Sequence, residues 1–254
     1  MNRKSKIWVW GQGVNAYKVW DMPDCKTDIV EGANIFSARN IFLVADRPAD
    51  LEKGTAGLAG FDRVVLAIWP QENFDYSGDI KAAGNLTQKY PNIEGVILDD
   101  LTSTEIATKG MKPHHLAKVR DEIKSGWPKL DLWGVMYSTN LDLPRLGEYL
   151  DCLDVMSFWT WDAKDLTGLE SNFKRTEELA KGKPILQGIY MWDFAQKTPI
   201  PMALMKHQCS LAEEWLRAGR TAGVILLGTS CADAPLEAVD YGKCWAKEIS
   251  QKSS

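Results

Sequence analysis

Two adjacent carboxylates at the end of a short apolar run are the residues of this sequence best suited to chemistry. Residues 94–98 have the composition of a fully buried strand, and Asp99 and Asp100 follow them directly. The packing of a buried strand does not call for two acids at one end. A plain structural alternative is that one Asp caps the next helix while the other is solvated. Because similar polar tips end other strand-like runs, we expect a functional site here.

Four further acids follow strand-like runs elsewhere in the chain: Asp46, Glu72, Asp162 and Asp193. Cleavage of a glycosidic bond needs two carboxyl groups, one protonated as the acid and one ionised as the nucleophile or base. Adjacent acids and apolar rings separate the pKa values of such groups. We predict Asp99 and Asp100 as nucleophile or base, with Asp193 or Asp162 as the acid. The other two acids are predicted to cap loops or to accept hydrogen bonds from substrate.

Tryptophan is unusually frequent, with 11 in 254 residues, and five of these lie at the ends of strand-like runs: Trp10, Trp69, Trp159, Trp161 and Trp192. The C–H face of a pyranose packs on an indole, whereas its hydroxyl groups need acids, amides and hydroxyls nearby. We therefore predict a sugar-binding rim, completed by polar residues at other strand ends: Tyr137, Tyr190 and Thr229. Trp159, Trp161 and Trp192 are predicted to form its stacking platform. The alternative is that these rings only fill the interior of the fold.

Eight strand-like runs, alternating with segments of helical spacing, must position these residues. The runs cover residues 7–10, 41–45, 64–69, 96–99, 132–137, 154–159, 185–190 and 224–227. Leu116, Val119 and Ile123, which follow Pro113, illustrate the helical spacing. This alternation predicts an α/β fold, a single (β/α)8 TIM barrel that spans residues 1–254 as one domain. The weakest unit is 50–61, where three glycines leave little room for a helix.

Composition excludes several classes of partner. The formal net charge is −4 and no block of Lys or Arg is present, which argues against nucleic acid. No apolar run approaches the about 20 residues of a membrane span, and residues 1–6 pass into strand-like residues without a signal-peptide core. We therefore expect a soluble protein with no membrane partner, periplasmic or secreted if a leader was removed. The oligomeric state stays open.

Motifs for metals and organic cofactors are sparse. His114, His115 and His207 fall on predicted helices, and the five cysteines are odd in number without a C-x-x-C pair. Residues 11–16, Gly-Gln-Gly-Val-Asn-Ala, fit the dinucleotide fingerprint G-x-G-x-x-G/A. Pro23 leaves little room for the helix that should follow, and no acid ends a second strand about 20 residues on. We predict no metal and no cofactor, and keep a dinucleotide-dependent enzyme as the third hypothesis.

Several strands together resemble those of chitinase-type glycoside hydrolases. Residues 94–101, Glu-Gly-Val-Ile-Leu-Asp-Asp-Leu, are similar to a degenerate D-G-x-D-x-D-x-E strand, and 154–162 are similar to the sixth strand, which ends in M-x-Y-D. The resemblance implies a barrel with Asp99 and Asp162 at matching positions. The catalytic Glu of that family would fall at Leu101, so its substrate-assisted acetamido mechanism is not implied. The chain also resembles α-galactosidase-type barrels, which use Asp on strands four and six as nucleophile and acid.

The residues and the resemblance together predict a carbohydrate-active barrel. The first hypothesis is a glycoside hydrolase that cleaves an O-glycosidic bond of an oligo- or polysaccharide with paired carboxylates. The second is a catalytically inactive barrel that binds sugar, which the missing family Glu favours and the doubled Asp disfavours.

Overall fold

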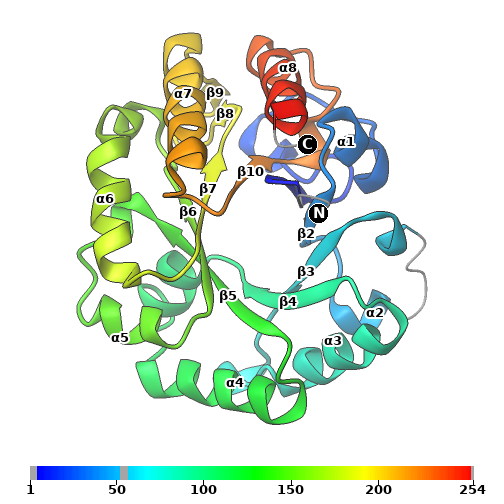
Figure 1. Cartoon of the computed structure of the whole chain (residues 1–254), viewed down its shortest axis with the longest axis vertical. Helices are drawn as coiled ribbons and strands as arrows, with labels where there is room; N and C mark the ends of the chain where they lie inside the picture. Colours follow the sequence, from blue (N-terminus) through cyan, green and yellow to red (C-terminus); the bar gives the residue numbers. More distant parts are fainter. Residues whose placement is uncertain (1–4, 52–56, 253–254) are drawn as a thin grey trace.

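The apolar runs of the sequence form a closed barrel of eight parallel strands surrounded by helices (Figure 1). The computed structural model describes residues 5–51 and 57–252. Around the barrel the strands pair in the order β1–β10–β7–β6–β5–β4–β3–β2, which confirms the predicted (β/α)8 fold. The barrel strands are β1 (Ile7–Gly11), β2 (Asn40–Leu43), β3 (Arg63–Ile68), β4 (Ile93–Leu98), β5 (Asp131–Tyr137), β6 (Val155–Trp159), β7 (Ile185–Ile189) and β10 (Gly223–Leu227).

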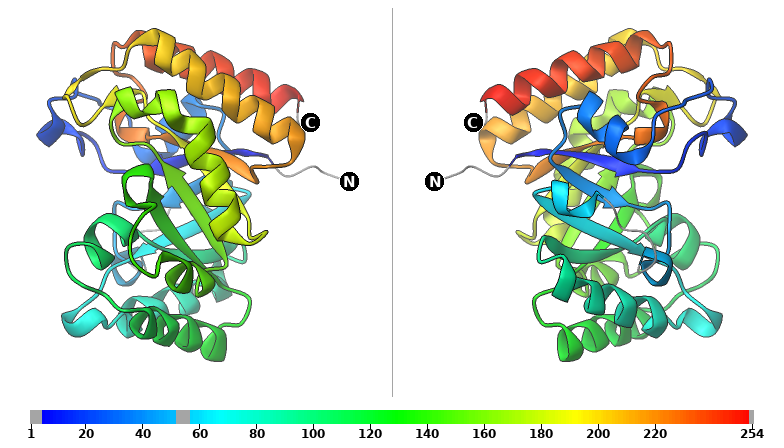
Figure 2. Two further views of the ribbon diagram at one scale, coloured as in Figure 1. Left: turned by 90° about the vertical axis from the view of Figure 1, so that its left-hand side faces the viewer. Right: turned by 90° about the vertical axis from the view of Figure 1, so that its right-hand side faces the viewer.

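The helices cover the outside of the barrel and turn their apolar faces toward it. They are α1 (Ile29–Ile35), α2 (Pro48–Leu51), α3 (Ser77–Lys89), α4 (Pro113–Gly126), α5 (Leu146–Asp151), α6 (Leu169–Ala180), α7 (Met202–Ala218) and α8 (Glu237–Lys252). On α4 the predicted stripe of Leu116, Val119 and Ile123 is buried. The long helices α7 and α8 pack side by side (Figure 2). The weak unit 50–61 contains only the last residues of α2 and a short 3-10 turn among its described residues, and 52–56 lie outside them.

One element had no sequence signal. After β7 the chain forms a small antiparallel hairpin from β8 (Trp192–Asp193) and β9 (Thr198–Pro199). Strands of two residues are too short to show an alternating pattern, so the sequence suggested only a loop at this position. The hairpin follows the carboxyl end of a barrel strand, where TIM barrels place their functional loops.

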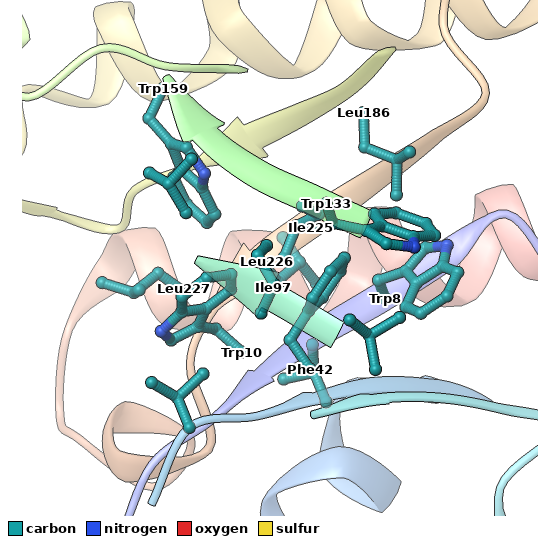
Figure 3. Close-up of a cluster of buried hydrophobic side chains, with 14 of the residues drawn as sticks. Trp8, Trp10, Phe42, Ile97, Trp133, Trp159, Leu186, Ile225, Leu226 and Leu227 are labelled. Atoms are coloured by element: carbon teal, nitrogen blue, oxygen red, sulfur yellow. The ribbon is translucent and has the colours of Figure 1, made fainter. Parts of the chain in front are cut away.

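Aromatic rings fill the barrel interior. Near the amino-terminal end of the strands, Trp8 packs against Phe42 and Trp133, with ring centroids 4.8 and 5.5 Å apart (Figure 3). Nearer the other end, Trp10 meets Phe42 at 5.3 Å and Trp159 at 5.5 Å. The many tryptophans therefore serve the core as well as the rim, because indoles in tilted and edge-to-face contact fill the barrel interior.

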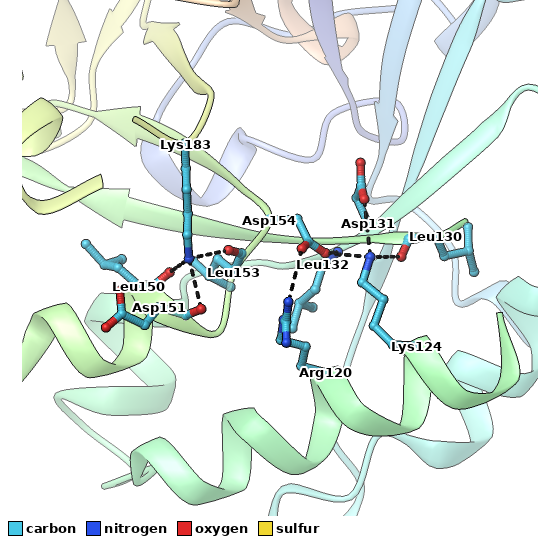
Figure 4. A network of polar contacts seen from close by, with 10 residues as sticks. All are labelled: Arg120, Lys124, Leu130, Asp131, Leu132, Leu150, Asp151, Leu153, Asp154 and Lys183. Atoms are coloured by element: carbon cyan, nitrogen blue, oxygen red, sulfur yellow. Dashed lines mark hydrogen bonds and ion pairs between the residues drawn. The ribbon is translucent and has the colours of Figure 1, made fainter. Parts of the chain in front are cut away.

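The amino-terminal end of the barrel is held by ordinary structural contacts (Figure 4). Lys124 pairs with Asp154 at 2.9 Å and donates to the Leu130 carbonyl at 2.8 Å. Lys183 donates to three backbone carbonyls at the end of α5 and just beyond it, at 2.7 to 2.8 Å. These contacts tie helices to strand starts, and they leave the opposite end of the barrel for function.

The close packing of indoles against strands predicts a strict requirement for glycine at position 188. A Cβ added to Gly188 would lie 2.1 Å from ring atoms of Trp159, so alanine must displace that ring. We expect Gly188→Ala to lower the free energy of unfolding by about 1–3 kcal/mol. Gly147→Ala on α5 is the matched control, because no atom lies within 4 Å of the added Cβ. Urea unfolding measures both, and equal stability of the two variants would contradict the packing described here.

Candidate active site

A cavity of about 150 Å³ opens at the carboxyl end of the barrel strands. It is lined by two acids, one amide, eight aromatic rings and two aliphatic side chains: Asp99, Asp100, Gln12, Trp10, Tyr17, Trp20, Tyr137, Trp159, Trp161, Tyr190, Phe194, Val135 and Leu227. Ligand sites for drug-sized molecules usually occupy about 300–1,000 Å³. This cavity is therefore suited to one small ring rather than to a chain.

The two acids enter the cavity because the chain turns sharply after β4. Asp100 adopts a left-handed conformation with φ of 49°, which Asp tolerates better than most residues, and a π-helical turn follows at Leu101–Ile106. The amide N–H of Asp100 donates to Asp99 Oδ1 at 2.9 Å. Tyr137 Oη, at the end of β5, donates to Asp100 Oδ1 at 2.7 Å. Both carboxylates of the predicted pair are thus brought together in one cavity.

Burial changes the ionisation of Asp99. Burial, reinforced by the neighbouring charge of Asp100, raises the pKa of Asp99 to about 7. Burial also raises the pKa values of Tyr17, Tyr137 and Tyr190 well above their usual range, so these phenols stay protonated. At neutral pH the cavity can therefore hold a protonated carboxyl group beside a carboxylate that accepts a hydrogen bond from a phenol.

The aromatic wall of the cavity is built around Trp161 and Tyr190. The Trp161 ring lies 5.1 Å from Trp20, 6.1 Å from Tyr137 and 5.9 Å from Tyr190, all in edge-to-face contacts. Tyr190 lies 4.9 Å from Trp159, which is itself only 2% exposed. The predicted platform is thus divided between a buried floor at Trp159 and a half-buried wall at Trp161.

Trp20 reaches this wall from the loop after β1, and the β8–β9 hairpin holds it there. Trp192 Nε1 donates to the Trp20 carbonyl at 3.1 Å. Lys197 Nζ donates to the Val19 carbonyl at 3.2 Å and pairs with Asp21 at 3.3 Å. Trp192 is therefore placed behind the cavity, where it anchors a wall residue, and is not among the lining residues.

The other predicted acids lie outside the cavity. Asp162 pairs with Lys164 at 2.5 Å and accepts from its amide at 3.1 Å. Asp193 is buried and accepts from the amides of Ala195 and Gln196 at 3.2 Å, as a turn-forming Asp does. Asp46 and Glu72 are exposed on their loops. The structure therefore does not bring these four carboxylates to the pair at the end of β4.

Two remaining predicted residues support the site from outside the lining. Trp69 is half-buried at the end of β3, where its amide donates to Asp79 at 2.9 Å and its carbonyl accepts from Arg47 at 3.1 Å. Thr229 is fully buried, and its hydroxyl both donates to the Gln12 carbonyl at 2.8 Å and accepts from the Gln12 amide at 3.0 Å. Thr229 thereby positions a residue of the cavity.

Sequence reasoning missed Gln12, Tyr17, Trp20 and Phe194 as lining residues. The first three lie in the irregular segment after β1, and the fourth lies in the hairpin. Neither segment has a periodic pattern that would tell which side chains turn inward. Among these four residues, only Trp20 offered a sequence signal for the site, because a tryptophan in a polar loop needs a packing partner.

Two family motifs considered in the sequence take a different form in the structure. Leu101, at the position of the chitinase Glu, is fully buried and does not line the cavity. Residues 11–16, which fit the dinucleotide fingerprint, lead into a turn and the 3-10 helix Lys18–Trp20, and the first α-helix begins only at Ile29. The fingerprint needs a helix N-terminus directly after the glycines, and that helix is missing within this described segment.

The described residues contain neither a metal-ligand cluster nor a helix suited to a membrane. Within residues 5–51 and 57–252, no group of three or more His, Cys, Asp or Glu side chains is arranged to hold a metal ion. Over the same part of the chain, no helix has both the length and the apolar character required to cross a bilayer. All five cysteines are free thiols.

No protein-family model and no curated protein matches the sequence, so the chitinase-type resemblance gains no support. Solved structures match in fold. A candidate α-L-fucosidase from Bacteroides thetaiotaomicron is 14% identical over 98% of this chain and 97% of that chain, with a TM-score of 0.62. A calcium-binding mutant of Bacteroides uniformis β-glucuronidase 2 is 11% identical over 88% of this chain and 30% of that one, with a TM-score of 0.58. An archaeal fructose-1,6-bisphosphate aldolase is 13% identical over 98% of this chain and 94% of that chain, with a TM-score of 0.54. Identities this low establish the shared TIM-barrel fold alone.

The raised pKa of Asp99 predicts that the folded protein loses stability as the pH rises. Between the pKa of an unfolded Asp, about 3.9, and the folded value of about 7, the folded state keeps a proton that the unfolded state releases. The free energy of unfolding should therefore fall across this window and stay low above it. Asp99→Asn cannot titrate, so we expect it to be more stable than wild type at pH 8 and to show a flatter pH curve.

Asp162→Asn is the comparison variant, because Asp162 should change the free energy of unfolding with pH in the opposite direction to Asp99. Lys164 holds the pKa of Asp162 below its usual value, so this carboxylate stabilises the fold above the unfolded pKa and stops doing so as the pH falls. Urea unfolding between pH 4 and pH 8 measures all three proteins. A wild-type curve as flat as that of Asp99→Asn would show that Asp99 is not perturbed.

Proposed function

We propose that this chain is a glycoside hydrolase that cleaves an O-glycosidic bond of an oligo- or polysaccharide. The observation that carries the proposal is the pair Asp99 and Asp100 inside an aromatic cavity at the carboxyl end of the barrel. One acid with a pKa of about 7 beside another that accepts from a phenol is an arrangement suited to acid catalysis near neutral pH. The aromatic walls suit the C–H faces of a sugar ring.

The roles follow from the local geometry. Asp99, whose pKa of about 7 leaves a substantial fraction protonated at neutral pH, is assigned as the proton donor to the leaving oxygen. Asp100, fixed by Tyr137, is assigned as the carboxylate that stabilises positive charge at the anomeric carbon or activates water. The acid role first predicted for Asp193 or Asp162 moves to Asp99, because those two carboxylates are engaged in local turns and do not line the cavity.

A sugar-binding barrel without turnover is the second candidate, and one observation favours it. Both acids come from the end of a single strand, and no acid from another strand lines the cavity in the described parts of the chain. Standard glycosidases place two carboxyl groups on opposite sides of the bond. The glycosidases among the structural neighbours share only the fold, so they do not decide between the two candidates.

Substitution of the paired acids tests the enzyme assignment. Asp99→Asn and Asp100→Asn keep the side-chain shape but cannot transfer a proton or carry charge, so each should lower kcat by at least about 10²-fold. Release of nitrophenol from a panel of 4-nitrophenyl glycosides identifies a working substrate and then measures the variants. Asp193→Asn preserves the turn acceptor and should keep its rate. Loss of turnover in Asp193→Asn together with full activity in Asp99→Asn would overturn the roles.

The two tryptophans of the cavity should behave differently when truncated. Trp161 is half-buried in the wall, so Trp161→Ala should weaken sugar binding by about 1–2 kcal/mol with little change in melting temperature. Trp159 is 2% exposed and forms the floor, so Trp159→Ala should cost about 3–5 kcal/mol of stability. Melting curves and ligand titrations on both variants check this. A large stability loss in Trp161→Ala with unchanged affinity would assign that ring to the core.

A further inference from the structure

The charge inside the cavity is of one sign. The lining residues include two carboxyl groups, Asp99 and Asp100, and contain no Lys, Arg or His. Two bases outside the lining pair with acids, Lys164 with Asp162 and Lys197 with Asp21, and Lys197 Nζ also lies 5.9 Å from the centroid of the Trp20 ring. A ligand in the cavity therefore meets two carboxyl groups and no cation among the lining residues.

The cavity that holds this pair of acids is lined by aromatic rings. Trp20, Trp161 and Phe194 contact one another at centroid distances of 5.1 to 6.1 Å, and Tyr17 meets Phe194 at 5.4 Å. Aromatic faces attract cations through their quadrupole, and an enclosure of several rings is a recurring way to bind an ammonium group. Aromatic rings offer no such attraction to an anion.

The Tyr17 hydroxyl is a polar group of the cavity wall. The side chain of Tyr17 is 9% exposed and lines the cavity, and its hydroxyl interacts with the side chain of Ser230. A phenolic oxygen can also accept a hydrogen bond, so it can serve as an acceptor for a donor group of a ligand.

We propose that the sugar bound in this cavity carries a free, protonated amine, so that the substrate class is an amino-sugar glycan whose nitrogen is not acetylated. This inference rests on the proposed function and names its substrate. The ammonium group would donate a hydrogen bond to the Asp100 carboxylate while its charge interacts with the rings, and the proton of Asp99 stays available for the leaving oxygen. An acetamido group would lose the charge and add volume to a cavity of about 150 Å³. A uronic acid would place a third carboxylate in it.

Isothermal titration calorimetry of the whole chain with methyl glycosides tests the proposal. The probes are the free-amine, N-acetyl and parent neutral forms of the gluco and galacto series, together with methyl glucuronide. We expect one free-amine probe to bind at least tenfold more tightly than both its N-acetyl and its neutral counterpart.

Two variants assign the effect to the cavity. Asp100→Asn should reduce the preference for the free amine at least tenfold, whereas Asp142→Asn, which removes an exposed charge beyond β5, should leave it unchanged. Equal binding of the amine and neutral forms would overturn the inference and leave the proposed function standing. Failure of every sugar to bind would overturn the proposed function, and the inference with it.

Discussion

The burial of two adjacent carboxyl groups beneath aromatic rings is the constraint on which the rest of the site depends. Two negative charges close together in an apolar cavity repel each other, and burial raises the free energy of each ionised form. The protein meets this constraint with a proton on Asp99, whose pKa rises to about 7, and with a phenol that donates to Asp100. The position of Tyr137 is fixed in turn, because its amide donates to the Thr102 hydroxyl at 3.2 Å. The protonation of Asp99 and the local stability are therefore coupled at the end of β4.

The same packing explains where the tryptophans lie. Two of the indoles fill the barrel where the neighbouring strand carries a glycine in place of a side chain. A Cβ on Gly95 would lie 2.4 Å from Trp133, and one on Gly188 would lie 2.1 Å from Trp159. The top of this aromatic column is the floor of the cavity, so the core and the ligand site share Trp10 and Trp159. A change to the core near these rings will alter the shape of the site.

The fold and part of the site could be predicted from the sequence, because both depend on local patterns. Alternating apolar runs and helical stripes determine a barrel, and barrel geometry then brings strand ends together. Asp99, Asp100, Tyr137 and Tyr190 directly end or follow strands, and all four line the cavity. Their catalytic and binding roles stay predictions.

The remaining lining residues lie on segments whose conformation depends on contacts far along the chain. Trp20 is held by Trp192, 172 positions away, and no local pattern encodes that contact. Asp162 and Asp193 are the opposite case, in which the sequence predicted site residues that do not line the cavity. An acid after a strand has the same sequence signal whether it caps a turn or faces a ligand. Only the three-dimensional positions of the amides around Asp193 distinguish these two uses.

The protonation state of Asp99 tests this account most directly. Carbon-13 NMR of protein labelled at the Asp carboxyl groups follows each carboxyl group through a pH titration. The account predicts one carboxyl signal with a midpoint near pH 7 that is missing from the spectrum of Asp99→Asn. If every Asp signal titrates below about pH 5, in the range of ordinary Asp residues, the two carboxyl groups are not coupled in a buried cavity, and the account is wrong.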